Sequence, residues 1–229
     1  MPTTDPDRGR LALVIGIPEF SPAARPPVPD LLFATQRTTE LRQVLGSELN
    51  GYQCLTDDAD QQLSGRELGL RIRGVLEDEQ AGDVLIVHIL THGRPGTTRK
   101  LYALGADGQS SPDTSVSSWL EIVEEFGARR VLFLLDLCHA GNAARQEYLL
   151  KKMDGRNKAW VIAASLPDEK AFNGYFTQAA ASVLDDIQRR VRQIHPSVEH
   201  VPFGTLVDWI RLAVYQLAEN PRENALRQT

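Results

Sequence analysis

Three continuous apolar runs constrain the fold of this chain more than any other feature of its sequence. The runs are Leu11–Ile17, Val84–Leu90 and Val131–Leu135. Apolar runs of this length, without polar alternation, are typical of parallel strands that are buried on both faces. Each run is far shorter than the roughly 20 apolar residues that a membrane-spanning helix needs. The chain is therefore expected to fold around a sheet that helices cover on both sides.

Shorter patterns between these runs predict the remaining elements. Strands are predicted at Leu11–Ile17, Tyr52–Leu55, Asp83–Leu90, Leu101–Leu104, Val131–Leu135 and Ala159–Ala164. Helices are predicted at Asp30–Leu45, Ser64–Gln80, Ser118–Phe126, Thr177–Arg192 and Thr205–Leu217, and a helix or loop at Ala143–Met153. Strands that alternate with helices predict an α/β fold, a three-layer α/β/α sandwich around a mostly parallel sheet of about six strands.

The sequence also predicts details of the first two helices and of the chain ends. Leu32, Leu41 and Leu45 are expected to form the apolar stripe of the first helix, and Ser64 is the expected N-cap of the second. No internal repeat or long linker divides the chain. A single domain is therefore expected over residues 11–217, with a flexible tail over residues 1–10 and a polar tail over residues 218–229.

Composition limits the classes of function that the chain can serve. It has 229 residues, of which 42% are hydrophobic and 24% charged, the profile of a soluble globular protein. The formal net charge of -5 gives no overall positive field to attract a nucleic acid. No secretory signal is visible, and two cysteines are too few for a disulfide framework. The expectation is a cytoplasmic protein with no nucleic-acid and no membrane partner.

Two neighbouring strands are each followed by a residue that can take part in acyl transfer. His92 follows the strand that ends at Leu90, and Cys138 follows the strand that ends at Leu135. Functional groups of parallel sheets gather beyond the carboxyl ends of the strands. An imidazole that takes the thiol proton produces the thiolate that attacks an acyl carbon, and the backbone N–H groups of Gly93 and Cys138 are the candidate oxyanion hole. A lone Cys or His at such a position is more often structural, but their joint placement favours catalysis.

Around these residues the chain resembles the caspase-like cysteine peptidases, most closely the metacaspases and their bacterial relatives. VLIVHILTHG resembles the family's His motif and VLFLLDLCHAG its Cys motif, with Leu137 and Ala140 in place of the usual serines. The likeness extends through LALVIGIPEF, TDDAD, KAWVIAASLPDEKAF and GYFTQAAASVL, and so covers roughly residues 10–217. It implies a caspase-like fold and a cysteine-type endopeptidase, with Cys138 as nucleophile and His92 as general base and acid.

The resemblance also implies which side chains select the substrate. Asp136 matches the metacaspase aspartate that pairs with Arg or Lys before the scissile bond, a charge-assisted contact. The alternative is that Asp136 caps a turn. Arg37 occupies a second pocket position where metacaspases carry an aspartate and true caspases an arginine, so it would partly neutralise the pocket, unless the alignment is shifted by a turn. Ser165 and Asp168 are further candidates for substrate contacts, or plain loop residues.

The segment between the Cys motif and the next strand carries several basic residues. Caspase relatives are often cut in this connection, so it holds candidate autocleavage positions; the alternative is a solvated basic helix face. These positions are Arg145, Lys151, Lys152, Arg156 and Lys158.

No metal or cofactor is expected. His88 and His92 have the H-x-x-x-H spacing, but they lie along a strand without a third ligand, so zinc is rejected. Asp107 and Asp113 are too few oxygen ligands for a calcium site. His139, His195 and His200 are taken as structural.

The resemblance implies a regulated protease (a zymogen) that cleaves protein or peptide substrates after Arg or Lys. In bacteria such proteases are often linked to stress, cell death or phage (antiviral) defence, and an upstream activating protein or protease is a possible partner. Two alternatives remain open. One is an Asp-specific caspase-like peptidase, and the other is a catalytically silent interaction module that keeps the fold.

Overall fold

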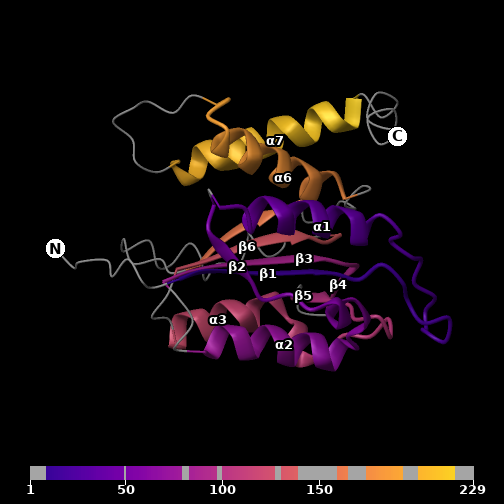
Figure 1. Ribbon diagram of the computed structural model, residues 1–229. Helices are drawn as coiled ribbons and strands as arrows, with labels where there is room; N and C mark the ends of the chain where they lie inside the picture. The colour runs from indigo at the N-terminus through magenta and orange to yellow at the C-terminus, as the bar shows by residue number, and fades with distance from the viewer. Residues whose placement is uncertain are drawn as a thin grey trace.

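A parallel sheet of five strands forms the centre of the molecule (Figure 1). The computed structural model describes residues 9–48, 50–78, 83–96, 100–126, 130–138, 159–164, 174–192 and 201–219. The strand order is β2-β1-β3-β6-β7, and every neighbouring pair is parallel. The strands are β1 (Arg10–Gly16), β2 (Tyr52–Cys54), β3 (Val84–Leu90), β6 (Arg130–Asp136) and β7 (Ala159–Ala163).

Helices cover both faces of this sheet, which confirms the predicted α/β/α sandwich (Figure 1). On one face lie α2 (Gly65–Glu77) and α3 (Val116–Phe126). The other face carries α1 (Ala34–Leu45) and α6 (Tyr175–Gln188), and α7 (Phe203–Glu219) packs against α6 as the outermost helix.

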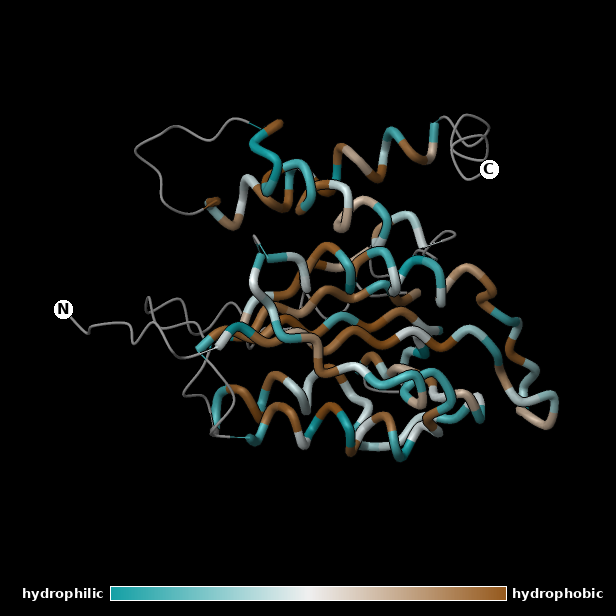
Figure 2. The backbone as a smooth tube through the Cα atoms, viewed as in Figure 1, coloured by the Kyte–Doolittle hydropathy of each residue, from teal (hydrophilic) through white to brown (hydrophobic). Residues whose placement is uncertain are grey.

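Two apolar cores follow from the alternation of side chains along the strands. Leu13, Val87 and Phe133 point into the core beneath α2 and α3. Ile86 and Leu134, one residue out of step, point into the core beneath α1 and α6. The strands are accordingly brown along most of their length in Figure 2. Burial on both faces explains why they read as unbroken apolar runs.

The predicted cap of α2 is confirmed. The Ser64 hydroxyl accepts the N–H of Glu67 at 3.3 Å, and the Glu67 carboxylate accepts the N–H of Ser64 at 2.9 Å. This reciprocal pair satisfies two backbone donors at the start of the helix. The helix ends at Glu77.

The start of α1 and the role of Leu32 differ from the prediction. The helix begins at Ala34, because the Asp30 carboxylate accepts the N–H of Phe20 at 2.8 Å and the N–H of Leu31 donates to the Pro18 carbonyl at 2.7 Å. These two bonds close a Pro-rich loop. Leu32 lies on it with 75% of its surface exposed and is not part of the apolar stripe. Leu41 and Leu45 are buried, as predicted.

The strand predicted at Leu101–Leu104 does not join the sheet. It forms β5 (Leu101–Ala103), which pairs antiparallel with β4 (Gly93–Pro95) in a separate two-stranded ribbon. This ribbon directly follows the end of β3. Because β5 pairs within the ribbon, the sheet has five strands among the described residues instead of the expected six. The strand β4 and two 3-10 turns, Asp58–Gln62 and Pro112–Thr114, were not predicted.

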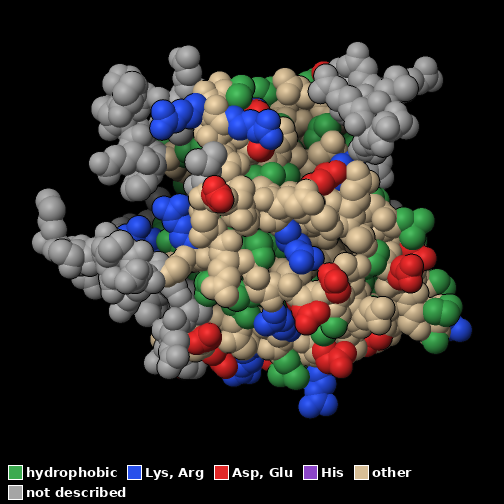
Figure 3. All heavy atoms as spheres, in the orientation of Figure 1, with side chains coloured by type: hydrophobic (Ala, Val, Ile, Leu, Met, Phe, Trp, Pro, Cys, Tyr) green, Lys and Arg blue, Asp and Glu red, His purple; other side chains and the backbone are tan. Residues whose placement is uncertain are grey.

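The surface in Figure 3 intersperses basic and acidic side chains, without a patch of a single sign on that face. Among the described helices, none combines the length and the apolar character that crossing a bilayer would require. The predicted helix or loop at Ala143–Met153 and the two predicted tails, apart from residues 9–10 and 218–219, lie outside the described residues.

Candidate active site

The pairing of β3 with β6 brings together the two strand ends that precede the predicted dyad. The two strands run parallel in unbroken register from Val84 opposite Arg130 to Leu90 opposite Asp136. His92 and Cys138 each lie two residues beyond the last pair of this register, Leu90 and Asp136. Both residues therefore follow adjacent strand ends at the carboxyl edge of the sheet.

Gly93 and Cys138 touch through their backbones. A Cβ atom placed on Gly93 would collide with the carbonyl oxygen of Cys138 and would lie 3.1 Å from a methyl group of Leu101. Only a residue without a side chain allows this approach. The two backbone segments expected to form the oxyanion hole are thus adjacent.

The His92 ring has a defined tautomer. Its Nε2 lies 2.8 Å from the carbonyl oxygen of Pro29, which can only accept, so Nε2 carries the proton and Nδ1 keeps its lone pair. The ring of Phe20 packs against it at 5.1 Å between centroids and an angle of 54°. Burial lowers the pKa of His92, although the bond to Pro29 opposes the shift. The ring is therefore neutral at pH 7 and able to take a proton.

The backbone of His92 is fixed by the β4–β5 ribbon. Its carbonyl accepts the N–H of Leu104 at 3.0 Å, and the neighbouring Thr91 hydroxyl donates to the Leu104 carbonyl at 2.8 Å. The Pro-rich loop that supplies Pro29 is held by the N–H of Ser21, which donates to the Ala106 carbonyl at 2.7 Å. Ring and backbone of His92 are thus positioned from two sides.

The two cysteines lie in different settings. Cys138 is half-buried directly after β6, while Cys54 lies in the edge strand β2. The Cys54 thiol donates to the Arg42 carbonyl at 3.7 Å, and burial raises its pKa. The raised pKa makes Cys54 a poor nucleophile at neutral pH, because the thiolate is the nucleophile.

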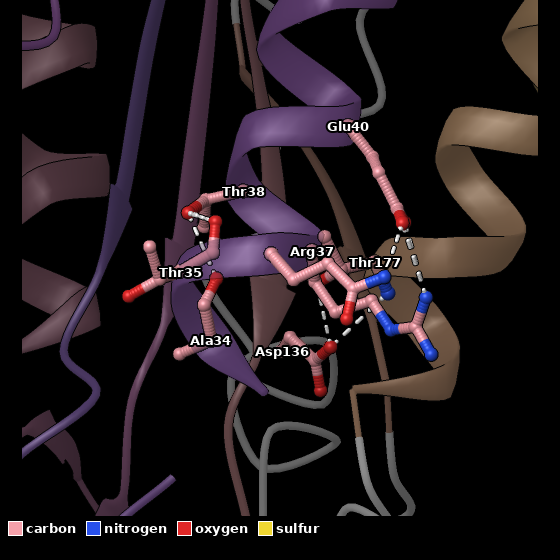
Figure 4. Close-up of polar contacts among 8 residues, drawn as sticks. Ala34, Thr35, Arg37, Thr38, Glu40, Asp136 and Thr177 are labelled. Atoms are coloured by element: carbon pink, nitrogen blue, oxygen red, sulfur yellow. Dashed lines mark hydrogen bonds and ion pairs between the residues drawn. The ribbon is translucent and has the colours of Figure 1, made fainter. Parts of the chain in front are cut away.

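Asp136 holds the start of α6. Its Oδ2 accepts the backbone N–H of Thr177 at 3.1 Å and the hydroxyl of Thr177 at 2.6 Å (Figure 4). Gly174, the N-cap of α6, has no side chain with which to do this. Asp136 is 2% exposed, and burial raises its pKa to about 6, against the opposing effect of the two bonds from Thr177. The carboxylate thus acts as a helix cap supplied by a neighbouring strand.

His88 extends this contact to β3. Its Nε2 lies 2.8 Å from the Thr177 hydroxyl oxygen, and its Nδ1 has no hydrogen-bond partner among the described residues. The ring is fully buried, and burial lowers its pKa to about 3. Sequence reasoning missed the roles of His88 and Thr177; the one available signal was the single imidazole inside the apolar run VLIVHIL.

The Arg37 side chain forms an ion pair with a residue of its own helix, α1. Its Nη1 lies 3.1 Å from Oε2 of Glu40, and its side-chain stem packs near Gly174 at the start of α6. Figure 4 shows the guanidinium directed toward Glu40 and the Asp136 carboxylate bonded to Thr177. Within the described residues, the charge of Arg37 is balanced by Glu40, and no ion pair joins it to Asp136.

The remaining candidates lie outside the described residues. These are Ser165, Asp168 and the five basic autocleavage positions Arg145, Lys151, Lys152, Arg156 and Lys158. In the part of the chain that the structure describes, no three His, Cys, Asp or Glu side chains come together as metal ligands would. The imidazoles of His88 and His92 take separate partners.

The chain was compared with protein-family models and with curated proteins. Neither comparison gives a match.

Proposed function

We propose that this protein is a caspase-like cysteine endopeptidase that works through a dyad of Cys138 and His92. One observation supports the proposal: the paired strands β3 and β6 end two residues before His92 and Cys138, and the backbone of Gly93 contacts that of Cys138. The bond from Nε2 of His92 to Pro29 adds support, because it leaves Nδ1 as the proton acceptor.

The reaction follows from these groups. Nδ1 of His92 takes the Sγ proton of Cys138, and the thiolate forms a bond to the carbonyl carbon of the peptide. His92 then returns the proton to the leaving nitrogen as the C–N bond breaks, which leaves an acyl thioester. Water attacks the thioester, giving its proton to His92 as the C–S bond breaks, and the thiol is restored. The N–H groups of Gly93 and Cys138 stabilise the oxyanion in both steps.

The preferred substrate residue before the scissile bond is Arg or Lys. Asp136 lies two residues before Cys138, and both of its bonds from described residues fall on Oδ2. The other oxygen has no bonding partner among those residues and is the acceptor for a substrate cation. Because Glu40 neutralises Arg37, the charge of Asp136 is not cancelled by that arginine. Asp136 is ionised at pH 7 and attracts a guanidinium or ammonium group.

Cleavage of three fluorogenic peptides, ending in Arg, Lys or Asp, tests the proposal. The expected result is release of fluorophore after Arg or Lys that disappears in Cys138→Ala. Release after Asp would mean that Arg37, and not Asp136, selects the substrate residue. The protein would then be the Asp-specific alternative. Absence of all cleavage, even after addition of a lysate from the host, would favour the silent interaction module.

The physiological role is proposed from the resemblance alone. It is that of a regulated bacterial protease in stress, cell-death or antiviral signalling, acting on protein substrates. Activation depends on an upstream protein or protease, or on cleavage in the basic segment after the Cys motif.

A further inference from the structure

One buried hydroxyl joins the two strands that carry the dyad. Thr177 is fully buried in the first turn of α6. Its oxygen lies 2.8 Å from Nε2 of His88 in β3 and 2.6 Å from Oδ2 of Asp136 in β6. The contact therefore links three elements through a single atom.

The proton positions in this contact are fixed by chemistry. The hydroxyl has one proton, and the ionised Asp136 can only accept, so Thr177 donates to Asp136. The hydroxyl oxygen then accepts the Nε2 proton of His88. Each group has one role, and removal of the hydroxyl would leave both a buried donor and a buried acceptor short of a partner.

The contact lies on the strand segments that lead into the dyad. His88 stands four residues before His92, and Asp136 stands two residues before Cys138. His88 is opposite Leu134, the residue two before Asp136, in the β3–β6 register. A small shift between the two strands would change both the Thr177 contact and the approach of Gly93 to Cys138.

We propose that Thr177 is a positioning residue of the dyad. Its hydroxyl holds the end of β3 against the end of β6, so that Nδ1 of His92 stays aligned with Sγ of Cys138. The inference rests on the proposed function and adds to it a residue that lies outside the His and Cys motifs.

The buried polar contact is not the most stable way to fill this space. Nδ1 of His88 is buried with no hydrogen-bond partner in the described part of the chain, which is unfavourable, and an apolar side chain of similar size would avoid that cost. A role in alignment accounts for a polar junction at this point, since polar networks fix geometry more narrowly than apolar packing does.

The rate constant for iodoacetamide alkylation of Cys138, resolved by peptide mass spectrometry, tests the inference without a substrate. In the wild type this rate should exceed that of His92→Ala. Thr177→Val keeps the shape of the side chain but removes the hydroxyl, and it should lower the rate by roughly 10- to 100-fold, toward the His92→Ala value. Thr177→Ser keeps the hydroxyl and should restore most of the rate.

Thr38→Val is the matched control. Thr38 is a second buried threonine, 4% exposed, but its hydroxyl donates only to the α1 backbone, at 2.8 Å from the Ala34 carbonyl oxygen (Figure 4). Its loss should lower the melting temperature without changing the alkylation rate. If Thr177→Val behaves in the same way as Thr38→Val, Thr177 is structural and the inference is wrong. If the wild-type rate does not exceed that of His92→Ala, the proposed function fails first, and the inference with it.

His88→Leu covers the case in which Thr177→Val does not fold. It removes the link to β3 and also the unpartnered Nδ1, so the protein should be at least as stable as the wild type. Its alkylation rate should nevertheless fall. A stable His88→Leu protein with the wild-type rate would overturn the inference.

Discussion

Gly93 is the residue at which the two halves of the candidate site meet. Its backbone lies against the Cys138 carbonyl so closely that no side chain fits between them. The motif predicted this glycine, because His-Gly follows a buried strand. It did not predict Pro29, whose carbonyl fixes the His92 tautomer from 63 residues away in the chain. Short motifs specify local geometry, whereas such a partner depends on how a distant loop folds.

Substitution of this glycine tests the contact. Gly93→Ala should lower peptidase activity by at least about 100-fold, because the added methyl group pushes the two strand ends apart by a fraction of an ångström or more. Gly74→Ala is the control, since a Cβ there meets nothing within 4 Å. That helix substitution should leave activity unchanged and raise stability by about 0.5–1 kcal/mol. Full activity of Gly93→Ala would contradict the contact.

Asp136 predicts a pH dependence of specificity. Its pKa is raised to about 6, so the carboxylate loses its charge as the pH falls through 6. KM for an Arg-terminated peptide should therefore rise below pH 6, with a smaller change in kcat. In Asp136→Asn, KM should be high and independent of pH over the same range. A wild-type KM that is flat from pH 5 to pH 7 would remove Asp136 from substrate binding.

At the level of elements, apolar patterning predicted most of the sheet and helices. It gave the long strands, because burial on both faces produces continuous apolar runs. It placed the start of α1 too early, and it counted Leu101–Leu104 among the strands of the sheet, whereas β5 pairs with β4 in a separate ribbon. In both cases the structure is determined by a contact between residues that are not sequence neighbours. Asp30 bonds to Phe20 before α1, and β5 pairs with β4.

The cap of α2 gives a prediction for one element. Ser64→Ala removes the hydroxyl that accepts the Glu67 N–H and should cost about 1 kcal/mol in the free energy of unfolding. Ser118→Ala, whose hydroxyl makes only a 3.5 Å bond to the Pro112 carbonyl, should cost much less. Urea denaturation followed by circular dichroism measures both. Equal losses would mean that the cap contributes nothing specific.

For the whole molecule, His88 and Asp136 affect stability with opposite signs. The folded pKa of Asp136 is raised to about 6 from 3.8, so the folded state binds more protons between these values, and stability falls as the pH rises. The folded pKa of His88 is lowered to about 3 from 6.5, so the unfolded state binds more protons, and stability rises with pH. The two effects oppose each other between pH 4 and pH 6.

Removal of either group should therefore reveal how the other group alone changes the folding stability with pH. As the pH rises from 4 to 6, the stability of His88→Leu should fall relative to that of the wild type. Over the same range the stability of Asp136→Asn should rise relative to that of the wild type. Each difference should approach about 1.4 kcal/mol per pH unit at most. Denaturation midpoints measured across this range provide the comparison. Three parallel curves would show that neither group titrates as its burial implies.

The nucleophile itself is the central claim, and an electrophilic peptide tests it most directly. A peptide chloromethyl ketone ending in Arg alkylates a thiolate that displaces its chloride. Mass spectrometry after incubation at pH 7 should find the adduct on Cys138, with Cys54 unmodified, since burial raises the pKa of the Cys54 thiol. His92→Ala should abolish the adduct. Equal labelling of both cysteines, or labelling of Cys138 that does not depend on His92, would contradict a Cys138–His92 dyad.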